Sequence, residues 1–129
     1  MNAQGTLEKR RILFVDDEQS ILDGLRNRLR KKRDQWDMRF ALGGKDALAQ
    51  LATERFDIIV TDMRMPGMDG AEVTKQIRDR LNMPNLVVIA LTADATRESQ
   101  QRSLAAGMND YLTKPVRQRD LYELLSKWA

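Results

Sequence analysis

The segment FDIIVTD, residues 56–62, is the most informative part of the sequence for predicting the fold. Residues 57–60 within it form a nearly uninterrupted apolar run, and residues 12–15 and 86–91 repeat that pattern. Strands of this kind are typical of a parallel sheet whose two faces are both covered by helices. The stretches between the runs carry apolar residues at helical spacing, so strands and helices are expected to alternate.

On both sides of this segment, the sequence divides into five strand–helix units. Strands are predicted at residues 12–15, 38–42, 56–60, 86–91 and 111–113, and helices at 20–30, 45–51, around Val73 and Ile77, 96–106 and 119–128. The pattern predicts a doubly wound α/β sandwich of the (βα)5 type, with a five-stranded parallel sheet. Residues 1–10 have no apolar period and are expected to form a flexible N-terminal tail, and residues 11–129 one domain.

The composition excludes several kinds of chemistry. The 129 residues are 42% hydrophobic and contain neither cysteine nor histidine, which rules out disulfides, zinc–thiolate sites and Ser-His-Asp triads. The remaining ligands are hard oxygens, which favour Mg²⁺, Mn²⁺ or Ca²⁺. A net charge of +3 is too mild to predict direct nucleic-acid binding, and no run approaches the ~20 apolar residues of a membrane span. We therefore expect a cytoplasmic protein that does not associate with membranes.

Polar residues gather where the predicted strands end. Asp16 and Asp17 follow the first strand, Asp62 the third, Thr92 the fourth and Lys114 the fifth. Each alone is commonly a turn, cap or surface residue. In doubly wound sheets, however, ligands bind outside the carboxyl ends of the strands, and three carboxylates brought together there need a cation. The combination predicts a divalent metal site suited to phosphoryl transfer, in which the lysine and metal hold phosphate oxygens while a carboxylate attacks.

These residues resemble the receiver domains of two-component response regulators over about residues 11–128. The resemblance lies in four segments: FVDDE at 14–18, TDMRMPGMDG at 61–70, ALTA at 90–93 and YLTKP at 111–115. It implies a flavodoxin-like strand order of 2-1-3-4-5 and a switch operated by phosphorylation.

For the metal and phosphate, the resemblance implies roles for residues at the strand ends. Asp62 would be the phosphoacceptor. Asp17, Asp62 and the backbone carbonyl of Arg64 would ligate Mg²⁺, for which Mn²⁺ can substitute, while Asp16 would act through a metal-bound water. Lys114 would pair with the acyl phosphate, and the peptide bond between Lys114 and Pro115 would be cis.

The resemblance also implies a switch and a control of its lifetime. Thr92 would bind the phosphoryl group, and Thr92 with Tyr111 would be the pair that rearranges on phosphorylation. Arg64 and Asp94 would flank the mouth of the site, where they are expected to tune the lifetime of the phosphorylated form.

The resemblance implies particular partners as well. Because the chain has no histidine, a phosphohistidine donor must lie on another protein or on a segment absent here, such as a sensor histidine kinase or a histidine phosphotransfer protein. A downstream output domain or protein, or a second copy of the chain in a homodimer, would read the switch. The chain would catalyse its own phosphotransfer and dephosphorylation without turning over a separate substrate, as a stand-alone regulator or as part of a longer protein.

Two alternatives belong to other classes of protein. A hydrolase of the haloacid-dehalogenase type would have a second aspartate two residues after Asp16, where Glu18 stands, and usually a cap domain for which the chain has no room. It would hydrolyse small phosphate esters. The second alternative is a non-enzymatic binding module. As a flavodoxin-like cofactor binder it would need a glycine-rich loop after the first strand, which is missing, and as a degenerate receiver used only for dimerisation it would lack part of the acidic and lysine set.

Overall fold

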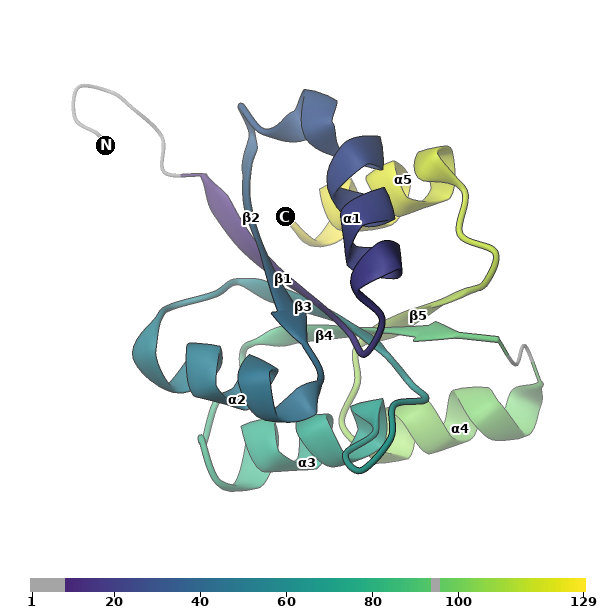
Figure 1. Cartoon of the computed structure of the whole chain (residues 1–129). Helices are drawn as coiled ribbons and strands as arrows, with labels where there is room; N and C mark the ends of the chain where they lie inside the picture. Colours follow the sequence, from purple (N-terminus) through teal and green to yellow (C-terminus); the bar gives the residue numbers. More distant parts are fainter. Residues whose placement is uncertain (1–8, 94–95) are drawn as a thin grey trace.

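The computed structural model describes residues 9–93 and 96–129, which form a five-stranded parallel sheet flanked by helices (Figure 1). The strand order is β2-β1-β3-β4-β5, as predicted. The strands are β1 (Arg10–Asp16), β2 (Trp36–Leu42), β3 (Ile58–Asp62), β4 (Val87–Thr92) and β5 (Asp110–Thr113). The helices are α1 (Gln19–Arg28), the 3-10 helix η1 (Arg30–Lys32), α2 (Gly44–Thr53), α3 (Gly70–Asp79), α4 (Arg97–Ala105) and α5 (Gln118–Trp128).

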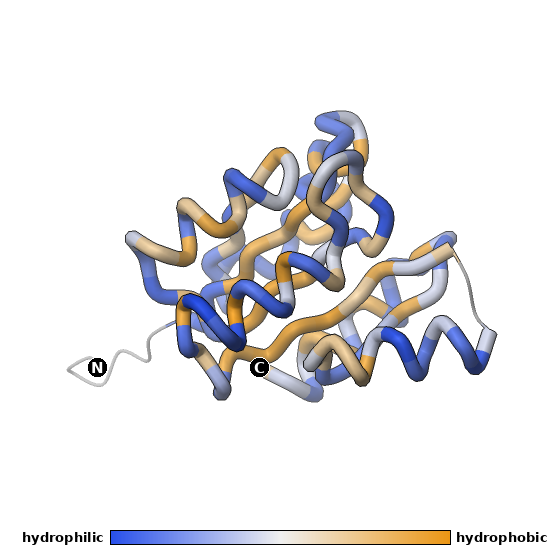
Figure 2. Tube along the Cα trace, turned by 90° about the horizontal axis from the view of Figure 1, so that it is seen from below, coloured by the Kyte–Doolittle hydropathy of each residue, from blue (hydrophilic) through white to orange (hydrophobic). Residues whose placement is uncertain are grey.

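The helices cover the sheet on both faces. Figure 1 shows α1 and α5 on one face and α2, α3 and α4 on the other. Successive residues of a strand point to opposite faces, so Ile12 and Phe14 pack in the core beneath α1 and α5, while Leu13 and Val15 pack with α2 and α3. The hydrophobic strands therefore lie in the interior and the polar helix surfaces outside (Figure 2).

The first two strands begin two residues earlier than their apolar runs predict. Arg10 pairs in register with Trp36, so residue 10 belongs to β1 rather than to a tail, and Trp36 is buried. The backbone N–H of Arg11 donates to Asp57 at 2.9 Å, and its guanidinium pairs with Glu54 at 2.7 Å. Polar residues thus extend β1 beyond its apolar run, and hydrophobic patterning alone does not detect this extension. Residues 1–8 lie outside the described part.

Helix α1 separates two neighbouring apolar side chains. Leu22 is buried in the core, whereas Ile21 remains 38% exposed on the outer surface. The helix ends at Arg28, earlier than predicted, and the basic residues Arg30, Lys31 and Lys32 form η1. No helix in the described ranges is both long and apolar enough to cross a membrane.

Candidate functional site

The carboxyl ends of β1 and β3 bring three carboxylates together. Val15 pairs with Thr61 in the parallel ladder, so the next residues, Asp16 and Asp62, emerge at the same edge of the sheet. One oxygen from each of Asp16, Asp17 and Asp62 lies within 4.8 Å of the others. From the end of β5, the Nζ atom of Lys114 reaches Oδ1 of Asp62 at 3.0 Å. The structure therefore gathers the acidic and lysine residues that the sequence singled out.

The carboxylate of Asp16 lies in an electrostatically unfavourable position. It is buried; its Oδ1 accepts a hydrogen bond from the backbone N–H of Glu18 at 3.0 Å, and its Oδ2 has no partner in the part of the chain that the structure describes. Burial, reinforced by the negative charge of Asp62, raises the pKa of Asp16 to about 6 against the opposing effects of the Glu18 N–H and of Lys114. A buried oxygen without a donor, facing two other carboxylates, fits a bound cation or its water ligands.

The loop from β3 to α3 is held tightly against the end of β3. The N–H of Met63 donates to the carbonyl of Leu91 at 2.9 Å, and the N–H of Gly70 donates to the carbonyl of Met63 at 3.0 Å. A Cβ atom at Gly70 would lie 2.7 Å from the carbonyl oxygen of Asp62, so only glycine fits there. Arg64, two residues beyond Asp62, is exposed at the start of this loop. The loop is thus fixed to the strand that carries Asp62.

The predicted switch residues lie on the neighbouring strands. Thr92 ends β4, is 6% exposed and pairs in register with Thr113. Its carbonyl accepts the N–H of Lys114 at 2.7 Å, and the bond between Lys114 and Pro115 is cis, the isomer that the resemblance implied. Tyr111 is half-buried against the core on the α2 and α3 side. Asp94 lies outside the described residues, so the structure does not place it relative to Arg64.

The family model of the response regulator receiver domain matches residues 12–126. The chain belongs to this family. Among curated relatives, the sensor protein GacS of Pseudomonas syringae pv. syringae is 40% identical over 90 residues, which are 67% of this chain and 10% of that protein. Hybrid signal transduction histidine kinase E of Dictyostelium discoideum is 39% identical over 128 residues, 96% of this chain and 7% of that protein. This receiver domain therefore spans a tenth or less of these relatives.

Solved receiver structures share the fold closely. CheY4 of Vibrio cholerae has a TM-score of 0.86 at 29% identity, covering 95% of this chain and all of that one. The receiver domain of the histidine kinase PA1611 from Pseudomonas aeruginosa, solved with magnesium in its active site cleft, has a TM-score of 0.82 at 32% identity, covering 94% and 98%. The receiver domain of Saccharomyces cerevisiae Ssk1, solved with the phosphotransfer protein Ypd1, has a TM-score of 0.85 at 29% identity, covering 93% and 88%.

Sequence reasoning missed two features of this region. The first is Gly70, whose close approach to Asp62 fixes the loop; the Asp69-Gly70 pair at the start of α3 was the available signal. Ser99 and Arg102 of α4 line a cavity that adjoins Thr92. No motif marks these two residues, because their position follows from how α4 packs.

Proposed function

We propose that this receiver domain is a signalling switch in which Asp62 accepts a phosphoryl group from a phosphohistidine of a partner protein. The observation that carries the proposal is the contact of 3.0 Å between Lys114 and Asp62 inside the three-carboxylate cluster. A carboxylate nucleophile, a cation beside it and an edge where parallel strands end are the parts that phosphoryl transfer requires.

The donor set supports Mg²⁺ as the cofactor, with Mn²⁺ as a substitute. Asp17, Asp62 and the backbone carbonyl of Arg64 would hold the ion, and the unpartnered oxygen of Asp16 would accept a hydrogen bond from one of its waters. When bound, the ion supplies positive charge that offsets the negative charge of the transferring phosphoryl group. All of these ligands are oxygens, which Mg²⁺ prefers.

The protein's own residues then position the reacting groups. A carboxylate oxygen of Asp62 attacks phosphorus and forms an O–P bond, while the P–N bond to the donor imidazole breaks and the nitrogen keeps the electron pair. Lys114 is close enough to Asp62 to hold an oxygen of the transferred group as negative charge accumulates there. Attack by water later releases phosphate and restores Asp62, so the chain turns over no separate substrate.

The switch would pass from Asp62 to the surface through Thr92 and Tyr111. A phosphoryl group adds roughly two negative charges. The Thr92 hydroxyl, at the end of the neighbouring strand, can donate a hydrogen bond to it. Tyr111 of β5 pairs in register with Ala90 of β4, the strand that Thr92 ends. Movement of Thr92 would leave room for the Tyr111 side chain to turn inward. The rearranged surface would bias an output domain, a partner protein or a second copy of the chain.

A groove beside α1 supports docking of the phosphodonor. It has a volume of about 520 Å³ and lies between α1 and the segment after β5, next to Lys114. Ile21, which is exposed, and Val116 contribute apolar surface to it. A helix of a sensor histidine kinase or phosphotransfer protein laid in this groove would bring its phosphohistidine toward Asp62. We place this exchange in the cytoplasm.

Intact-mass analysis after incubation with acetyl phosphate and Mg²⁺ tests the proposal. We expect the wild type to gain one phosphoryl group, and Asp62→Asn to gain none. Asp79→Asn, which alters an exposed carboxylate at the end of α3, serves as the matched control and should be modified like the wild type. Modification of Asp62→Asn at the wild-type rate would refute the assignment. Steady hydrolysis of p-nitrophenyl phosphate would instead favour a hydrolase.

A further inference from the structure

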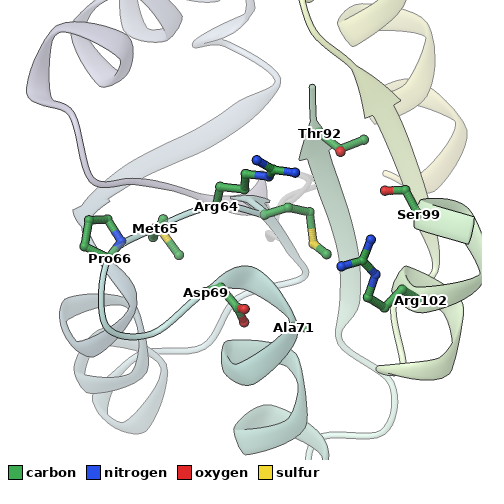
Figure 3. A pocket seen from close by; sticks show the side chains of 9 residues that line it. Arg64, Met65, Pro66, Asp69, Ala71, Thr92, Ser99 and Arg102 are labelled. Carbon is green, nitrogen blue, oxygen red and sulfur yellow. The ribbon is translucent and has the colours of Figure 1, made fainter. Parts of the chain in front are cut away.

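A second cavity lies beside the strand ends, between the β3–α3 loop and α4 (Figure 3). Its volume is about 520 Å³, which is within the range of small-molecule sites. One part of its wall is apolar and comprises Met63, Met65, Pro66 and Ala71. The other part is polar and comprises Arg64, Asp69, Thr92, Ser99 and Arg102. The cavity therefore combines an apolar surface with a concentrated set of hydrogen-bond donors.

Two arginines of the lining, Arg64 and Arg102, bring positive charge that forms no ion pair with an acidic side chain of the described residues. None of the ion pairs formed within residues 9–93 and 96–129 includes Arg64 or Arg102. In Figure 3 the guanidinium of Arg102 and the hydroxyl of Ser99 extend from α4 into the cavity, and Arg64 extends from the loop above. Ser99 is 5% exposed, so its position is fixed by packing. The donors thus converge from two elements.

Asp69 is the single acidic residue among the described lining residues, and one of its carboxylate oxygens already accepts a hydrogen bond from α3. Its Oδ1 caps α3 by accepting the N–H of Glu72 at 2.8 Å, where the helix dipole also favours a negative charge. The lining residues that the structure describes therefore include two guanidinium groups and one carboxylate, of which one oxygen is already engaged. Together these residues carry an excess of positive charge.

We propose that this cavity binds a phosphate monoester with an apolar substituent. Two guanidinium forks and one hydroxyl offer donors for the three terminal oxygens of such a phosphate, more than a carboxylate needs. The methionine and proline side chains beside them provide an apolar surface for the substituent, and methionine adapts readily to planar groups. The inference does not rest on phosphorylation of Asp62.

Phenyl phosphate is the probe for this site. Amide chemical shifts of the full chain, recorded in EDTA without phosphate buffer, should move saturably at Ala71, Ser99 and Arg102. Arg102→Ala should weaken binding at least about tenfold, since a charge-assisted bidentate contact typically contributes that much. Arg97→Ala removes an exposed arginine of the same helix that does not line the cavity, and it should bind like the wild type.

Two further variants test whether the anion binds in this cavity. Asp69→Asn keeps an oxygen that can cap α3 but removes the opposing charge, so it should tighten binding, an effect that misfolding cannot produce. Lys114→Ala should leave affinity unchanged, because Lys114 belongs to the strand-end site rather than to this cavity. Benzoate, which carries a carboxylate in place of the phosphate, should bind clearly more weakly.

Four results would overturn the proposal. The first is the absence of saturable shifts at millimolar phenyl phosphate. The second is equal weakening by Arg97→Ala and Arg102→Ala, which would indicate unspecific attraction to a basic helix. The third is loss of binding in Lys114→Ala, which would place the anion at the strand ends. The fourth is benzoate binding as tightly as phenyl phosphate.

Discussion

Replacing Asp16 by asparagine should stabilise the protein in the absence of divalent metal. Oδ2 of Asp16 is buried beside two other carboxylates without a donor in the described part of the chain, so its charge opposes folding until a cation is bound. Asparagine keeps an oxygen for the N–H of Glu18 and replaces the unpartnered oxygen by an N–H donor that can face Asp62.

The pKa of Asp16 sets the magnitude and the pH range of this effect. Raising the pKa of a carboxyl from 3.8 to about 6 corresponds to about 3 kcal/mol against folding when the group is charged. Solvent at the open mouth of the site screens part of this cost, so we expect a gain of roughly 1–2 kcal/mol for Asp16→Asn at pH 8. Because the folded-state pKa of Asp16 is raised, the free energy of unfolding of the wild type should fall as the pH rises through about 6. The stability gained by Asp16→Asn should therefore vanish below about pH 4.

Urea unfolding in EDTA at pH 4, 6 and 8 measures the effect. Asp79→Asn is the matched control, and as an exposed substitution it should change the free energy of unfolding by less than about 0.5 kcal/mol. Saturating Mg²⁺ should stabilise the wild type more than Asp16→Asn, because ligand binding to the folded state adds to stability. A variant no more stable than the wild type at pH 8, or a gain in stability that is the same at pH 4 and pH 8, would show that the charge of Asp16 does not oppose folding.

Three other predictions concern the metal, the lifetime and the fold. By calorimetric titration, Asp17→Asn should weaken Mg²⁺ binding more than Asp16→Asn, since a direct ligand contributes more than one acting through water; wild-type affinity in Asp17→Asn would contradict this. If an ion pair between Arg64 and Asp94 restricts the water that attacks the acyl phosphate, each alanine variant should speed dephosphorylation. The double variant should then speed it by less than the product of the two single effects. Multiplicative effects or unchanged lifetimes would mean that the two charges act independently or not at all. Arg78→Met should cost about 2–4 kcal/mol in urea unfolding, since the guanidinium of Arg78 donates to carbonyls after α3 and α4, and a loss below about 1 kcal/mol would contradict it.

Much of the fold could be predicted from the sequence because the central strands are apolar on both faces. The buried runs that became β1, β3 and β4 determine a parallel sheet, and helical spacing between them determines a doubly wound sandwich. The edge strand β2 was predicted too short, although Trp36, Met38 and Phe40 alternate with Asp37 and Arg39 as in a half-buried strand. The prediction relied on apolar runs and did not use this alternation; in the structure, Trp36 and Asp37 pair with Arg10 and Arg11 of β1.

The site was predictable in composition but not in its electrostatics. The polar residues after each strand identified Asp16, Asp17, Asp62 and Lys114, since parallel strands end at one edge. The unpartnered oxygen of Asp16 depends on how deeply the end of β1 is buried. The cavity lined by Ser99 and Arg102, and the contact of Gly70 with Asp62, depend on helix packing. Local sequence patterns do not encode such features, because they arise between elements rather than within them.

Identifying the modified residue is the sharpest test of Asp62 as the phosphoacceptor. An aspartyl phosphate is an acyl phosphate, which borohydride reduces to homoserine, so acetyl phosphate and Mg²⁺ followed by borohydride and fragment-ion sequencing should reveal homoserine at position 62. Asp16 and Asp17, which lie in the same cluster, should remain aspartate. Homoserine at position 16 or 17, or an unmodified residue 62 in protein that has gained the phosphoryl mass, would contradict the account.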